Sequence, residues 1–545
     1  MSDRTEIENA VGKVEEISPS AKLVALCEYG PSVYGRAGSW RGVDLMAICD
    51  EYPEGVRTHR RLTGKNEWRY LIVDRELFES DVSNGALGDF LTDKLLYPYL
   101  PLDNAEYLNQ HTLNFHGRLI REEVRNLVFE YGEMSRELVA KPEFYPLARM
   151  RMRARIFAPS MNDYTRLLDH KVRDRNLNTL REVSLQAAKI LGADTVHVDG
   201  NDLTIPDTLV DKLLKNKGPR QVVNILQQSQ RAVNSYLTRG RAVFLDLDLT
   251  ARELYSSFRV QIEQVTESKP EDPKNHLFAR TARGLVSVNE RTSLQEAIGE
   301  IRPGHGVTVV PLAGVLNEVF LITSGKERLV AKKFTDWNDF KWFTLNLVSF
   351  GSKLFSVSGK ARMTNEYGIN RYLSRKHLNV PDIVRISLNE RTLIEEYVPG
   401  KPVDKIIAEI VNQKNPSSSN LEIAEQLGET LSKIHGVGVS VGDSKPENFV
   451  AKDDEIYTVD LEQGGKRGDY AWDVAELLYY SGHYSRKPIP SGGLNELVKG
   501  FIKGYSKHGA KSELRKAAGV RYVKVFSIWT PAPVLLEISR MLRDV

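Results

Sequence analysis

The chain has 545 residues, 41% apolar and 27% charged, and its 75 basic residues nearly balance 72 acidic ones, which gives a net charge of +3. This composition is typical of a folded protein with more than one domain. It excludes global disorder and any chain-wide attraction to nucleic acid or to a membrane surface.

The number of cysteines and the hydropathy of the sequence indicate the cellular compartment. Only Cys27 and Cys49 are present, so a disulfide framework and a cysteine-rich zinc site are excluded. The first residues are too charged for a signal peptide, and no apolar run approaches the roughly 18 residues of a membrane span. We therefore expect a cytoplasmic protein.

Residues 1–105 mix helices with short strand-like runs at 43–48 and 70–74. A Gly-Ser turn precedes the first run, an aspartate lies within it and another ends the second. In this order the segment resembles nucleotidyltransferases of the DNA-polymerase-β type, in which the turn binds triphosphate and the carboxylates hold two metal ions. The resemblance implies a site at Gly38, Ser39, Asp44 and Asp74.

One position departs from that pattern. Gly42 stands where the nucleotidyltransferases have the first aspartate of a pair. A two-metal site without that carboxylate should bind metal poorly, so we expect a degenerate domain with a vestigial site. A nucleic-acid-acting nucleotidyltransferase would need the pair restored.

Residues 106–300 are mainly helical by pattern, as at 119–128. Arginine alternates with apolar residues at 148–157, and further basic residues follow. This basic patch, 149–175, could meet tRNA or another polyanion, but we favour a solvated face, because helices of mixed acidic and basic residues fill this region. A D-x-D sequence within 244–249 has no Gly-Ser turn before it, so we assign no metal site there.

Residues 301–545 begin with strands, at 307–312 and 318–323, and end in helices, which predicts an α+β domain with two lobes. Apolar residues spaced by three and four from Leu421 to Ile434 predict an amphipathic helix. The polar loop VGDSKPENFV (441–450) follows it, and then a hairpin that ends at Asp460. We therefore predict a multidomain α+β chain with domains at 1–105, 106–300 and 301–545.

The loop VGDSKPENFV resembles the protein-kinase pattern H-R/G-D-x-K-P-x-N. The resemblance implies that Asp443 accepts the proton of a substrate hydroxyl and that Lys445 stabilises charge on the transferring phosphate. Asn448 and Asp460 would hold Mg²⁺ or Mn²⁺, since hard cations prefer oxygen ligands. Val441 replaces the usual histidine, and Leu461-Glu462 replaces the Phe-Gly of D-F-G. We expect Glu462 to face solvent, with metal binding as the alternative.

The remaining kinase elements occur in the expected order. The strand at 328–334 resembles V-A-I-K and gives Lys332 as the ATP-phosphate lysine, with Lys333 as the alternative because strand side chains alternate. Four further features follow from the resemblance: an ion-pair partner on a helix, a hinge that receives adenine through backbone groups, an aspartate that braces the 441–450 loop, and a reduced phosphate loop with one glycine. These are Glu366, Glu396 with Tyr397, Asp473 and Gly314.

The reduced glycine loop and the short segment between Asp460 and Asp473 resemble the RIO and Bud32 atypical kinases and the aminoglycoside-phosphotransferase-like enzymes. The resemblance implies a bilobal kinase-like domain that uses ATP with Mg²⁺ or Mn²⁺, most simply as a serine/threonine protein kinase. A small-molecule kinase and a nucleotide-binding pseudokinase scaffold remain alternatives.

Overall fold

The computed structural model describes residues 4–35, 42–63, 66–157, 159–215, 230–231, 233–235, 238, 271–291, 296, 307–312, 317–336 and 358–545. Gly38, Ser39 and Gly314, which we assigned to phosphate binding, lie outside the described residues, as does the D-x-D sequence. The chain divides into two compact units, each described by itself. Unit 1 is Met1–Glu130 with Leu138–Phe278, and unit 2 is Tyr131–Glu137 with Ala279–Val545. The three-domain division stays a prediction.

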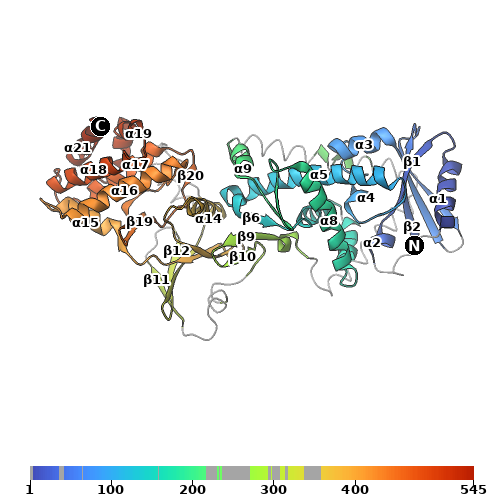
Figure 1. The fold of residues 1–545 in the computed structure, drawn as a ribbon, viewed down its shortest axis with the longest axis horizontal. Coiled ribbons are helices and arrows are strands. Elements are labelled where there is room, and N and C mark those ends of the chain that lie inside the picture. Colours follow the sequence, from blue (N-terminus) through green and yellow to red (C-terminus); the bar gives the residue numbers. More distant parts are fainter. Residues whose placement is uncertain are drawn as a thin grey trace. The chain divides into compact units, whose positions relative to one another are not determined.

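Unit 1 begins with a five-stranded sheet in the order β3-β4-β2-β1-β5, in which β2 and β4 are parallel (Figure 1). Alternating apolar residues such as Leu45, Ala47 and Ile72 form its core together with Val14 of α1. The elements are α1 (Arg4–Ile17), β1 (Lys22–Tyr29), α2 (Pro31–Tyr34), β2 (Gly42–Asp50), β3 (Val56–Thr63), β4 (Asn66–Asp74), α3 (Arg75–Asn84), α4 (Asp93–Leu96) and β5 (Leu100–Asp103).

The rest of unit 1 is mainly helical, as its apolar periodicity predicts. In the described residues a long helix, α5 (Ala105–Tyr131), is followed by four more α-helices and by short strands, of which β8 lies between β6 and β7. The elements are β6 (Leu138–Ala140), α6 (Phe144–Ile156), α7 (Pro159–Leu167), α8 (Arg173–Leu191), β7 (His197–Asp199), β8 (Asp202–Thr204), α9 (Asp207–Leu214), the 3-10 helix η2 (Pro273–His276) and β9 (Leu277–Thr281).

The alternating arginines lie on helix α6, and part of the expected basic patch is buried. Arg149 is 4% exposed, and its guanidinium pairs with three carboxylates, those of Asp89 at 3.1 Å, Glu122 at 2.5 Å and Glu123 at 3.3 Å. A buried arginine needs such partners, and it cannot meet a polyanion. The prediction of a polyanion-binding surface is therefore wrong for Arg149.

A histidine between two glutamates ties η2 to the helices of unit 1. The His276 ring nitrogens lie 3.2 Å from Glu143 Oε1 and 3.0 Å from Glu271 Oε1. Burial would lower the pKa of His276, but hydrogen bonds to the two carboxylates raise it overall. Burial would raise the pKa values of the two glutamates. The hydrogen bonds to His276 oppose that rise and help to lower the pKa of Glu143 and that of Glu271 to about 2.

Unit 2 opens with an antiparallel five-stranded sheet in the order β11-β12-β13-β15-β14. The strands of this sheet are β11 (Val307–Leu312), β12 (Glu318–Ser324), β13 (Glu327–Lys333), β14 (Ile383–Ser387) and β15 (Thr392–Glu396). Strand β10 (Gly284–Ser287) precedes them in the chain and pairs with β9. Helix α14 (Gly359–Arg375) packs on the 3-10 helix η1 (Gly132–Glu137). Gly368 permits that approach, since a Cβ there would lie 2.4 Å from the carbonyl carbon of Glu133.

The C-terminal part of unit 2 is a cluster of helices, orange to red in Figure 1. Helix α16 contains the periodic apolar residues from which it was predicted. Its Leu427 and Leu431 belong to the same hydrophobic core as Val498 and Phe501 of α18. The helices are α15 (Val403–Asn412), α16 (Ser418–Gly436), α17 (Tyr470–Ser481), α18 (Gly492–Tyr505), α19 (Lys511–Ala517), α20 (Val520–Phe526) and α21 (Ala532–Arg543), with the 3-10 helices η3 (Pro446–Asn448) and η4 (Gly482–Tyr484).

Short strands border the 441–450 loop. They are β16 (Lys401–Pro402), β17 (Val439–Ser440), β18 (Phe449–Lys452), β19 (Glu455–Thr458) and β20 (Gly465–Lys466). Strands β18 and β19 form the hairpin that the sequence predicts, and β17 pairs with β20. Among the described helices, none is long and apolar enough to cross a bilayer.

Candidate active site

Lys332 is the buried lysine of β13. It is 8% exposed, whereas Lys333 points to the opposite face, where its Nζ lies 3.9 Å from Glu318. The Lys332 ammonium donates to Glu366 Oε1 on α14 and, at 2.6 Å, to the carbonyl of Val459. The structure therefore joins Lys332 to Glu366, the residue that the sequence suggested as its partner.

A second glutamate shares this lysine. Glu395 of β15 lies 2.9 Å from Lys332 Nζ and is 3% exposed. Burial would lower the pKa of Lys332, but Glu366 and Glu395 hold it well above its usual value. Burial raises the pKa of both glutamates, and Lys332 opposes that rise. Glu395 was not among the site residues predicted from the sequence. Glu395 lies two residues after Leu393 on β15, so both side chains lie on one face, and the register pairs Leu393 with Lys332. The two-residue period of the strand was the available signal.

The 441–450 loop holds the next three candidate residues. Lys445 Nζ lies 2.9 Å from Asp443 Oδ1, and Asn448 Nδ2 donates to the Asp443 carbonyl at 2.7 Å. Burial would lower the pKa of Lys445, but the Asp443 carboxylate raises it. The loop thus presents a carboxylate with a cation beside it and an amide whose nitrogen is already engaged, which leaves the amide oxygen to face a ligand.

Asp473 of α17 fixes the start of this loop. Its carboxylate is fully buried and accepts from the backbone N–H groups of Val441 at 2.7 Å and Gly442 at 2.8 Å, and it lies 3.0 Å from His435 Nε2. Gly442 has φ of 82°, a conformation that favours glycine. Asp473 therefore makes the contacts of the brace that the resemblance implies.

Glu476, one helical turn further along α17, holds the next part of the loop. Its Oε2 accepts from the backbone N–H of Ser444 at 2.8 Å and from Trp472 Nε1 at 3.1 Å. Neither Glu476 nor His435 was among the site residues predicted from the sequence. The spacing of Asp473 and Glu476, three residues apart on one helix, was the available signal.

Asp460 follows β19 and lies beside two other carboxylates. Oxygen atoms of Glu366, Asp460 and Glu462 all lie within 4.8 Å of one another. Burial, reinforced by the charge of Glu462, raises the pKa of Asp460 to about 7. The expectation that Glu462 faces solvent is wrong. It is 5% exposed, and its Oε2 accepts from Arg362 Nη1 at 2.8 Å and from Asn317 Nδ2 at 2.7 Å.

The structure contradicts part of the hinge prediction, because the backbone N–H groups of Glu396 and Tyr397 are already hydrogen-bonded. The backbone N–H of Glu396 donates to the Asp382 carbonyl at 2.9 Å, and that of Tyr397 donates to the Arg328 carbonyl at 3.1 Å. Sheet pairing thus extends past the end of β15 and uses both groups. Neither N–H can donate to a base in this arrangement.

In unit 1 the structure separates the two aspartates of the expected vestigial site. Asp44 is buried against Arg69, with Oδ1 2.5 Å from Nε, and the strand register pairs Asp44 with Arg69 and Asp74 with Cys49. Asp74 lies five residues further along β4, about 16 Å away. Its carboxylate caps α3, accepting from the backbone N–H groups of Glu76 and Leu77. The assignment of Asp74 to a site shared with Asp44 is therefore wrong.

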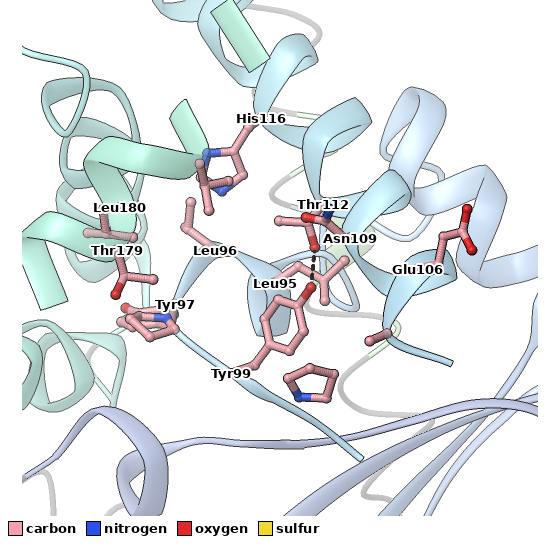
Figure 2. Close-up of a pocket in the computed structure, with 14 residues that line it drawn as sticks. Leu95, Leu96, Tyr97, Tyr99, Glu106, Asn109, Thr112, His116, Thr179 and Leu180 are labelled. Carbon is pink, nitrogen blue, oxygen red and sulfur yellow. Dashed lines mark hydrogen bonds between the residues drawn. The ribbon is translucent and has the colours of Figure 1, made fainter. Parts of the chain in front are cut away.

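A cavity of about 540 Å³ in unit 1 is bordered by α4, α5 and α8 (Figure 2). Its main polar groups bind one another or nearby residues. Tyr99 Oη lies 2.9 Å from Thr112 Oγ1, and His116 Nδ1 lies 3.2 Å from Ser184 Oγ. Burial lowers the pKa of His116 to about 4, so its ring is neutral near pH 7.

No protein-family model matches the chain, and no curated protein matches it. Among solved structures, the chain is similar to one described as "WaaP in complex with acyl carrier protein". The two share 13% sequence identity, the match covers 45% of this chain and 91% of that chain, and the TM-score is 0.28. A similarity at that TM-score is too low to assign a fold or an activity.

Proposed function

We propose that unit 2 is a kinase-like phosphotransferase that uses ATP with Mg²⁺ or Mn²⁺ and moves the γ-phosphate to a hydroxyl group. The observation that supports it is the convergence of residues from distant parts of the sequence. The ion-paired Lys332 and Glu366 lie beside Asp460. A β-hairpin, β18–β19, connects Asp460 to the loop that carries Asp443 and Asn448. Phosphoryl transfer requires this combination of one buried cation, oxygen ligands for metal and a carboxylate base.

The donors fit the proposed ligands. Asp460 and the Asn448 amide oxygen are hard ligands, suited to Mg²⁺ or Mn²⁺. A bound divalent ion would neutralise phosphate charge. The face of β13 that bears Lys332 also bears Val330, which is half-buried and offers an apolar surface to a base. Lys332 would release one of its acceptors and bind phosphate oxygens.

The roles of the 441–450 loop follow from its geometry. Asp443 would accept the proton of the attacking hydroxyl, and Lys445, whose Nζ lies 2.9 Å from Asp443 Oδ1, would stabilise charge on the transferring phosphate. Asp473 and Glu476 would act as positioning residues, because they hold the backbone that carries Asp443. As acceptor we propose a serine or threonine hydroxyl of a protein, the class that the resemblance to RIO and Bud32 kinases implies.

The test is transfer of label from γ-labelled ATP, with Mn²⁺ or Mg²⁺, to the chain itself and to a mixture of protein acceptors, with free phosphate followed in parallel. We expect label on protein with the natural chain and none with Asp443→Ala or Asp460→Ala. Asp454→Asn, at an exposed position of the β18–β19 turn, serves as the control. Nucleotide binding without transfer would move the acceptor to a small molecule. Absence of any nucleotide binding would refute the proposal.

A further inference from the structure

The three carboxylates around Asp460 form a compact oxygen cluster. Glu366 comes from α14, and Asp460 and Glu462 come from the segment after β19, yet oxygen atoms from all three lie within 4.8 Å of one another. Glu366 and Glu462 are buried, and Asp460 is half-buried. Three carboxylates held this close repel one another unless a cation or protons lie between them.

One oxygen of this cluster lacks a hydrogen bond. Glu366 Oε1 accepts from Lys332, but Glu366 Oε2 is buried and has no hydrogen-bond partner among the residues that the structure describes. Glu366 is 2% exposed. Such an oxygen costs about 1–3 kcal/mol when it is left unpaired. A Glu366 oxygen lies within 4.8 Å of oxygens of Asp460 and Glu462, so an ion bound among the three would lie beside this carboxylate.

The charges point to a divalent ion. Within the described part of the chain, the ion pairs of the cluster and of the neighbouring Glu395 involve two cations and four carboxylates, so two negative charges stay uncompensated when all are ionised. The cations are Lys332 and Arg362, and the carboxylates are Glu366, Glu395, Asp460 and Glu462. Burial of unpaired charge is costly, and one divalent cation would balance the set.

Glu462 is held as a metal ligand would be. Arg362 and Asn317 both bind its Oε2, at 2.8 Å and 2.7 Å, and so fix the orientation of the carboxylate. Contacts of this kind orient the ligands of metal ions in proteins. Asn317 also accepts from Arg362 Nη1, at 2.7 Å, which closes the network.

We propose that Glu366, Asp460 and Glu462 bind one Mg²⁺ or Mn²⁺ ion before nucleotide arrives. The inference rests on the proposed function in treating Asp460 as a metal ligand, and it adds two ligands and an order of binding. All three ligands are carboxylates, which suits hard cations and disfavours Zn²⁺. The ion would belong to the resting protein and would await the phosphates.

The test is Mn²⁺ binding to the full chain, stripped with chelator and free of nucleotide, by the electron paramagnetic resonance signal of free Mn²⁺. We expect saturation at one ion per chain. We expect binding about 10- to 100-fold weaker in Glu462→Gln and in Asp460→Asn. Asp454→Asn should match the natural chain, and circular dichroism checks that each variant is folded.

Absence of saturable Mn²⁺ binding in the natural chain would overturn the inference, and so would equal binding in folded Glu462→Gln. A parallel titration with a fluorescent ATP analogue and Mn²⁺ separates the two proposals. If nucleotide binds together with Mn²⁺ while Mn²⁺ alone does not bind, the resting metal site is wrong and the proposed function stands. If neither binds, both fall.

Discussion

Replacement of Asp473 by asparagine tests the buried brace of the 441–450 loop. The carboxylate accepts from the N–H groups of Val441 and Gly442 and contacts His435. Asparagine keeps the volume but has one acceptor oxygen, so its NH₂ group faces a donor. We expect the loss of a charge-assisted hydrogen bond, about 1.5–3 kcal/mol, together with an unpaired buried group, about 1–3 kcal/mol.

The expected destabilisation of unit 2 is therefore about 2.5–6 kcal/mol, or about 5–24 °C in melting temperature at about 2–4 °C per kcal/mol. Differential scanning calorimetry of the full chain measures it. Asp454→Asn makes the same chemical change at an exposed turn position and should shift the melting temperature by less than about 2 °C. An equally small shift in Asp473→Asn would show that the brace does not stabilise the loop.

Three further predictions follow from buried contacts. Glu395→Gln should tighten ATP binding about fivefold, the equivalent of about 1 kcal/mol, because Lys332 then leaves a weaker acceptor; titration with a fluorescent ATP analogue measures it. Gly368→Ala should lower the melting temperature of unit 2, although alanine normally favours a helix by about 1 kcal/mol, because the added Cβ meets backbone of η1. His276→Gln should lower the melting temperature of unit 1 by about 3–10 °C at pH 5.5 and by much less at pH 9.

The sign of the pH effect follows from the direction of each pKa shift. The pKa of His276 is raised above 6.5 in the folded chain, so its contribution is complete below pH 6.5 and is lost as the pH rises through the folded value. The pKa values of its two glutamates fall from 4.5 to about 2, so their contribution is complete above pH 4.5 and is lost toward pH 2. The cluster should stabilise unit 1 most between pH 4.5 and 6.5.

Each of these predictions has a result that contradicts it. Weaker ATP binding in Glu395→Gln would mean that Glu395 orients Lys332 rather than competes for it. Gly12→Ala, in α1 with nothing within 4 Å of the added carbon, should be neutral or stabilising, and Gly368→Ala must differ from it. An effect of His276→Gln that stays constant from pH 5.5 to 9 would exclude a charged histidine.

Periodicity was enough to predict several elements of unit 2. The spacing from Leu421 to Ile434 gave helix α16, and alternation in β13 placed Lys332 and Lys333 on opposite faces. Both inferences concern residues close in sequence, where 3.6- and 2-residue periods decide which way a side chain points.

Such patterns do not predict contacts between segments that are far apart in the sequence. Glu462 was expected in solvent, yet its partner Arg362 lies one hundred residues earlier on α14. Arg149 was placed in a basic patch, but it is buried and paired with acidic residues of other segments. The role of Asp74 had a local signal, because an aspartate directly before a helix is a common N-cap.

The most direct test of the proposed site compares nucleotide binding by Lys332→Met and Lys333→Met. The two variants remove the same charge from adjacent positions of β13, one inside the site and one on the opposite face. Titration of the folded full chain with a fluorescent ATP analogue and Mg²⁺ should show binding weakened at least about tenfold, the equivalent of about 1.4 kcal/mol, in Lys332→Met. Lys333→Met should stay within about twofold of the natural chain. Equal effects of the two substitutions, or a larger effect at Lys333, would contradict a phosphate-binding role for Lys332 and with it the proposed phosphotransferase site.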